Sequence, residues 1–141
     1  MSNYLKAILE VIKTGHWITD QVSIELKEFD ITEPQFNVLR ILNGRNGKPV
    51  TVQEIQSQMV QRSSNVTRII DKLLDKQFVE RKECPSNRRK MDITITQSGI
   101  DHLKILDQKL GKFHSSMKNN LSNTELEQLT ELIKKLKGET K

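Results

Sequence analysis

The side chains that could bind a ligand in a specific pattern are concentrated between residues 61 and 72. This segment combines short hydrogen-bonding groups with cations, and its apolar residues repeat at the spacing of a buried helix face: Val66, Ile69, Ile70, Leu73 and Leu74. Arginine can pair with guanine O6 and N7, while asparagine and serine can reach other base edges or phosphates. The exposed face therefore suits the DNA major groove. An ordinary amphipathic helix in contact with water is an equally good interpretation of this segment alone.

A second group of cations follows at Arg88, Arg89 and Lys90. The turn-forming residues 85–87 precede them, and the alternation over 92–96 predicts a half-buried strand, with 78–83 as its partner. The three cations are therefore expected at the tip of a hairpin loop. Three adjacent like charges are easier to understand if they meet a phosphate backbone or a narrow minor groove. The alternative is a solvated loop, which is the usual role of a short charge run.

The segment before these side chains contains the helix and the turn that must position them. Thr51 and Glu54 form a capping box that opens a short helix, and a polar turn over 61–64 follows, with Ser63 or Ser64 as the next N-cap. Two helices followed by a basic hairpin predict a winged helix-turn-helix, a DNA-binding module. The candidate DNA-contacting residues are Gln61, Arg62, Ser63, Ser64, Asn65, Thr67, Arg68, Lys72, Arg88, Arg89 and Lys90.

Four stretches resemble the MarR family (multiple antibiotic resistance regulators) over nearly the whole chain. They are residues 66–73, 78–81, 87–89 and 95–99. The resemblance implies a dimer that binds palindromic DNA, usually as a repressor, and often releases it when a small molecule or an oxidant acts. The family's wing carries an Asp-Arg-Arg motif whose Asp braces the wing through an ion pair. Here Asn87 replaces that Asp, so the ion pair is expected to be absent or replaced by a neutral hydrogen bond.

Composition agrees with a nucleic-acid partner. The 141-residue chain has a net charge of +5 and a pI near 9.4. Residues 61–92 hold nine Lys/Arg and five Asp/Glu, so this segment carries +4 and the rest of the chain only +1. One cysteine excludes an intrachain disulfide, and the sequence has neither a transmembrane run nor a secretory signal. A cytoplasmic location is expected.

The flanking segments predict helices that complete a homodimer. Residues 4–28 and 97–137 repeat apolar side chains at spacings of three and four, and capping boxes begin at Thr32 and Ser122. We expect one mainly α domain over 1–141, with a winged helix-turn-helix lobe at about 32–96 and dimerisation helices at about 4–28 and 97–137. A twofold dimer would present two reading helices about 34 Å apart. The alternative is that these helices pack only on their own domain.

No catalytic or metal-binding motif is present in the sequence, so neither an enzyme nor a cofactor is expected. A small aromatic or anionic effector could meet His16, Trp17, Phe36 and Arg40, although each could equally be a packing residue. Cys84 borders the wing and could sense oxidants, but an incidental thiol is the simpler interpretation. The alternative functions are a winged-helix protein-interaction module and a ligand-free architectural DNA binder.

Overall fold

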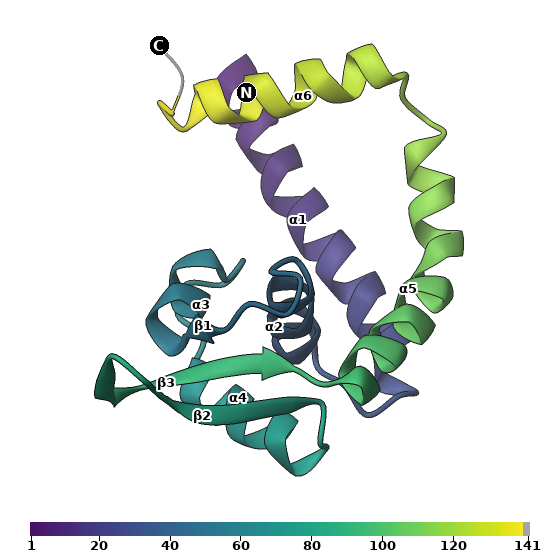
Figure 1. Cartoon of the computed structure of the whole chain (residues 1–141). Helices are drawn as coiled ribbons and strands as arrows, with labels where there is room; N and C mark the ends of the chain where they lie inside the picture. The colour runs from purple at the N-terminus through teal and green to yellow at the C-terminus, as the bar shows by residue number, and fades with distance from the viewer. Residues whose placement is uncertain (140–141) are drawn as a thin grey trace. The chain divides into compact units, whose positions relative to one another are not determined.

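The computed structural model describes residues 1–139, with the side chain of Arg88 excepted. It contains six helices and three strands over these residues (Figure 1). In chain order they are α1 (Asn3–Lys27), α2 (Glu33–Asn43), β1 (Val50–Thr51), α3 (Val52–Gln58), α4 (Val66–Asp75), β2 (Val79–Cys84), β3 (Asn87–Ile95), α5 (Gln97–Lys118) and α6 (Asn123–Leu136). The predicted mainly α fold with a small β-wing is confirmed.

The chain divides into two compact units, Met1–Asp107 and Gln108–Lys141, and α5 continues from the first into the second. The core of the first unit lies between α2, α3, α4 and the sheet. Its fully buried side chains include Val38, Leu39, Leu42, Ile55, Ile70, Leu73 and Ile93. Apart from Val38, these are residues that the helical and strand periodicities predict to face inward. Leu26 at the end of α1, together with Leu103 and Leu106 in α5, is also buried.

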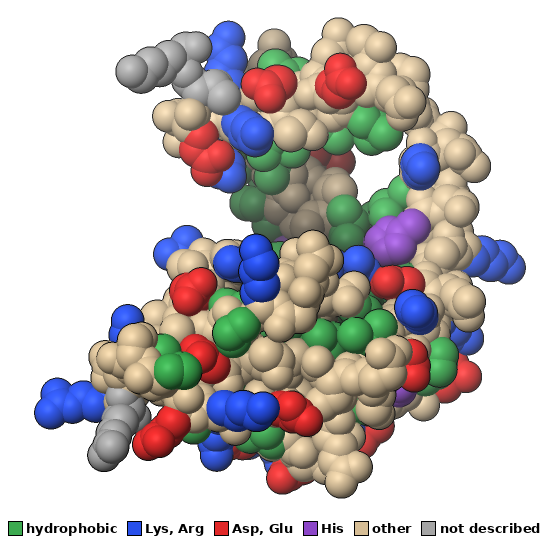
Figure 2. Space-filling view, in the orientation of Figure 1, with side chains coloured by type: hydrophobic (Ala, Val, Ile, Leu, Met, Phe, Trp, Pro, Cys, Tyr) green, Lys and Arg blue, Asp and Glu red, His purple; other side chains and the backbone are tan. Residues whose placement is uncertain are grey.

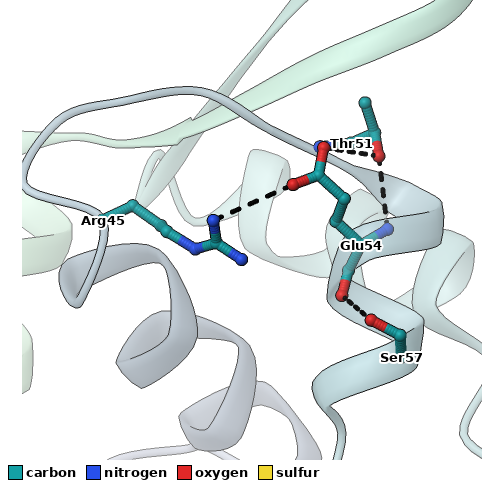
Figure 3. Close-up of polar contacts among 4 residues, drawn as sticks. All are labelled: Arg45, Thr51, Glu54 and Ser57. Carbon is teal, nitrogen blue, oxygen red and sulfur yellow. Dashed lines mark hydrogen bonds and ion pairs between the residues drawn. The ribbon is translucent and has the colours of Figure 1, made fainter.

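The three strands form one antiparallel sheet in the order β1-β3-β2. Val50 pairs with Ile93 and Val79 pairs with Ile95, so β3 is the central strand. Thr51 both pairs with Asp92 and caps α3, which ties the first helix of the helix-turn-helix to the wing sheet. In Figure 3, Arg45 reaches the carboxylate of Glu54, the residue that completes the Thr51 capping box.

The start of α5 is fixed by two local features. The Thr96 hydroxyl accepts a hydrogen bond from the Gly99 amide at 3.0 Å and so caps the first turn of the helix. A Cβ on Gly99 would lie 2.3 Å from the Phe78 carbonyl oxygen, so only glycine allows α5 to begin this close to β2.

The second unit is dominated by α6, which begins in the predicted Ser122 capping box. The helix has no buried residue, and its apolar side chains Leu129, Leu132, Ile133 and Leu136 are all exposed. Helix α1 likewise exposes Tyr4, Leu5, Val11 and Ile12 in this single chain. None of the helices described here is both long and apolar enough to cross a membrane.

Candidate nucleic-acid interface

Helix α4 presents the polar face that the sequence predicted. Val66, Ile70 and Leu73 are buried, which anchors the helix in the lobe. On the other side Thr67, Arg68, Asp71 and Lys72 are exposed. The apolar stripe therefore fixes which side chains α4 can offer to a ligand.

The N-terminus of α4 differs from the prediction that Ser63 or Ser64 caps it. The N-cap is Asn65, whose side-chain oxygen accepts a hydrogen bond from the Arg68 amide at 3.2 Å. Serine and asparagine cap about equally well, so local preference could not choose among three consecutive candidates. The buried position of Val66 places the first helical turn immediately after Asn65. Ser63 is exposed, whereas the Ser64 hydroxyl is enclosed and has no hydrogen-bond partner.

The turn between α3 and α4 is held by two side chains that the sequence reasoning missed. The Gln56 amide donates to the Arg62 carbonyl at 2.7 Å, and the Asn37 side-chain oxygen accepts from the Val60 amide at 2.9 Å. Asn37 lies 23 residues before Val60, so no local pattern could reveal this contact. The exposed side chains of Gln61 and Arg62 are thereby carried on a fixed backbone.

The three wing cations do not lie in a loop, which corrects the sequence prediction. Pro85 and Ser86 form the turn, and Arg88, Arg89 and Lys90 belong to β3. The pairing of Cys84 with Asn87 allows the strands to continue almost to the tip, after an irregularity between Glu83 and Cys84. The side chains of Arg89 and Lys90 are exposed. The side chain of Arg88 lies outside the described residues.

Two contacts stabilise the wing next to α4. The Asn87 side-chain oxygen accepts a hydrogen bond from the Arg89 amide at 3.0 Å, which matches the expected neutral replacement for the family ion pair. Arg81 on β2 forms an ion pair with Asp71 on α4 at 3.3 Å. A hollow of about 250 Å³ lies between helix and wing and is lined by residues that include Thr67, Arg81, Arg89 and Lys90. The cations of the wing and the polar face of α4 thus belong to one compact unit.

The surface combines these cations with polar side chains. Figure 2 shows Lys and Arg side chains at the free end of the hairpin, with acidic groups farther back on the lobe. An exposed helix beside a cationic ribbon can form hydrogen bonds with base edges and ion pairs with phosphates.

Of the four suggested effector-binding residues, the structure brings two together. The Arg40 guanidinium lies 4.9 Å from the centre of the Phe36 ring and forms an ion pair with Asp107. Phe36 is buried, whereas His16 and Trp17 on α1 are exposed. The Cys84 thiol is half-buried and lies 3.2 Å from the Ser86 hydroxyl.

Comparisons with known proteins agree with this geometry. The MarR family model matches residues 31–91. The HTH-type transcriptional regulator MhqR of Bacillus subtilis (strain 168) is 26% identical over 94% of this chain and 90% of its own length. The multiple antibiotic resistance protein MarR of Salmonella typhimurium is 30% identical over 79% of this chain and 76% of its own length.

A solved structure extends the comparison to three dimensions. A cysteine-to-serine mutant of E. coli MarR, crystallised in complex with operator DNA, superposes with a TM-score of 0.76 and 26% identity over 95% of this chain and 96% of that one. The winged helix-turn-helix is thus shared as a fold and not only as a motif. With the lobe, its exposed polar helix and these relatives in agreement, the chain belongs to the MarR family and is a transcriptional regulator.

Proposed function

We propose that this chain acts as a homodimeric repressor that reads palindromic operator DNA with α4 and holds the backbone with the β2–β3 wing. The observation that carries the proposal is the exposed polar face of α4, set beside the cationic strand β3 on one lobe. The E. coli MarR mutant of the same fold is bound to operator DNA, which supports the same use of this surface.

The proposed roles follow from side-chain chemistry. Thr67 and Arg68 lie on the exposed face of the first turns of α4, where the recognition helix of this motif meets base edges. The remaining candidates would contact phosphates or flank the bases: Gln61, Arg62, Ser63, Lys72, Arg88, Arg89 and Lys90. Asn65 caps the helix, and any DNA contact it makes would be additional to that role, while the enclosed Ser64 hydroxyl would need to become accessible to meet DNA.

Dimerisation would supply a second reading helix for the second half-site of the operator. The exposed apolar residues of α1 and α6 lie on helices outside the reading lobe, and burying them against a second copy would remove that surface from water. The twofold axis would present two α4 helices to successive major grooves, about 34 Å apart. Such a regulator acts on chromosomal DNA in the cytoplasm and needs no catalytic chemistry.

An effector would act by population shift. A small aromatic or anionic molecule that binds one dimer conformation more tightly would favour reading helices that no longer match the operator spacing. To act as a useful switch, effector binding and DNA binding must be coupled by a free energy of about 1–3 kcal/mol.

The test compares two single substitutions on two DNAs. DNA enriched from a random pool by the full-length protein supplies the specific site, and the unselected pool is the competitor. Arg68→Ala should weaken binding to the enriched DNA by about 1–3 kcal/mol and affect random DNA much less. Arg89→Ala should lower affinity for both DNAs and flatten the salt slope by about one unit.

Lys48→Ala is the charge-matched control, because it removes one exposed cation from the loop between α2 and β1, outside α4, the hairpin and the dimerisation helices. It should leave both affinities nearly unchanged. Equal losses on both DNAs for Arg68→Ala would exclude base reading by this residue. An Arg89→Ala variant with wild-type affinity and salt slope would exclude the wing from backbone contact, and tight binding to a protein partner instead of DNA would favour an interaction module.

A further inference from the structure

The DNA-reading lobe is attached to α5 through a pair of charged side chains. Arg40 on α2 and Asp107 on α5 form an ion pair between residues 67 positions apart in the sequence. The Arg40 guanidinium is also restrained by the Phe36 ring 4.9 Å beneath it. Their side chains are 54% and 44% exposed, so the pair contributes little to the overall stability of the fold.

Helix α2 is connected to the reading helix α4 by direct packing. It packs against α4, and its residues Val38, Leu39 and Leu42 are almost completely buried in the lobe core. Asn37 in the same helix also holds the turn that precedes α4. Because α2 and α4 share one core, a contact that fixes α2 relative to α5 also fixes the direction of α4.

A second attachment lies nearer the beginning of α5. His102 stacks on Phe78 with ring centres 4.5 Å apart and meets the edge of Phe29 at 6.1 Å. His102 and Asp107 are five residues apart, which is about 7.5 Å along a helix axis. One attachment point would allow the lobe to pivot on α5, whereas two points at this separation resist rotation.

We propose that Arg40 and Asp107 are positioning residues that set the angle of the reading helix on α5, and thereby the half-site spacing that the dimer accepts. The proposal rests on the proposed function as a dimeric DNA reader. Neither side chain needs to touch DNA. The pair would instead favour the one lobe orientation in which both α4 helices fit the operator at once.

Because Arg40 and Asp107 carry opposite charges, substitutions of the two residues can distinguish a positioning role from a simple charge effect on DNA binding. If Arg40 acted only through its charge, Arg40→Gln would weaken DNA binding and Asp107→Asn would strengthen it, because DNA is an anion. A positioning pair predicts that both substitutions weaken binding to the enriched DNA. With one exposed pair in each subunit, the expected loss is about two- to thirty-fold, and binding to random DNA should change far less.

The experiment measures fluorescence anisotropy on a spacing series of the enriched DNA, with one base pair removed from or added to its centre. Arg45→Gln is the matched control, since Arg45 loses the same charge but pairs with Glu54 inside the lobe. It should keep the wild-type spacing preference. Arg40→Gln and Asp107→Asn should bind the altered spacings almost as well as the original, and the double variant Arg40→Glu with Asp107→Arg should restore the preference.

Thermal unfolding and sedimentation verify that each variant is folded and dimeric. Unchanged specificity and spacing preference in both single variants would overturn the proposal while leaving the regulator function intact. Opposite effects of the two single variants would overturn it in favour of simple charge. If the wild type enriches no DNA at all, the proposed function fails first, and this proposal fails with it.

Discussion

The imidazole of His102 is enclosed between two aromatic rings at the junction of α5 with the lobe. Its Nε2 is buried and has no hydrogen-bond partner. Burial lowers the pKa of His102 from its ordinary value near 6.5, and the nearby Lys76 cation lowers the pKa further. The neutral ring is therefore the form that fits the stack with Phe78 and Phe29.

The lowered pKa predicts a loss of stability in acid. The unfolded chain binds a proton at His102 more readily than the folded chain, so the free energy of unfolding rises with pH. The full contribution is present above pH 6.5 and is lost as the pH falls through 6.5 towards the folded pKa. A single titrating group of this kind changes the free energy of unfolding by at most about 1.4 kcal/mol per pH unit.

Urea unfolding at pH 7.5 and pH 5.5 measures this dependence. The wild type should lose stability on acidification, and His102→Gln should lose less because it has no proton to gain. The same pH dependence in both proteins would show that His102 is not responsible.

Single residues also show what a sequence can and cannot reveal. The capping boxes at Thr32, Thr51 and Ser122 involve partners three positions apart, so the sequence alone predicted them and the structure confirms them. The ion-pair partner of Arg40, Asp107, lies 67 residues away, so the sequence alone does not predict this contact. Contacts of this range depend on tertiary packing, which periodicity does not encode.

At the scale of elements, α4 depends on its N-terminal cap. Asn65→Ala removes the acceptor for the Arg68 amide, and we expect a loss of about 1 kcal/mol in the free energy of unfolding. Asn65→Asp should retain the cap. Ser63→Ala is the control, because Ser63 is exposed and does not begin the helix.

Chemical denaturation of the three variants decides between the possible caps. Equal stability of Asn65→Ala and the wild type, together with a loss for Ser63→Ala, would place the cap where the sequence first suggested it.

The sequence predicts the β2–β3 hairpin only in part. Alternation over residues 92–96 correctly predicted a strand, and its partner was placed within a residue or two. The first half of β3 has no alternating pattern, because Arg88, Arg89 and Lys90 are all polar, so the sequence predicts a loop for this segment. The backbone pairing at the tip comes from the tight turn at Pro85 and Ser86 and not from apolar burial.

At the scale of the whole molecule, the apolar residues of α6 carry the dimer proposal. Leu132 is 63% exposed in the single chain and shares one helix face with the exposed Leu129, Ile133 and Leu136, an apolar stripe that a partner chain would cover. Leu132→Glu should therefore shift the protein from dimer to monomer while each chain keeps its lobe folded. Glu127→Lys changes an exposed charge on the same helix and serves as the control.

Sedimentation equilibrium over a range of protein concentrations measures the change, and circular dichroism monitors the fold. The loss should be at least about tenfold in dimer affinity, since a buried carboxylate without a partner is costly. A Leu132→Glu protein that remains a dimer at the wild-type affinity would remove α6 from the interface.

Fluorescence anisotropy of the wild-type protein measures whether this lobe reads DNA in a sequence-specific way. The measurement compares DNA enriched from a random pool with the unselected pool at two salt concentrations. We predict that the enriched DNA binds at least about 10³-fold more tightly and that affinity falls steeply as salt is raised. Equal affinity for both DNAs, or no binding even at low salt, would exclude sequence-specific DNA reading by this lobe.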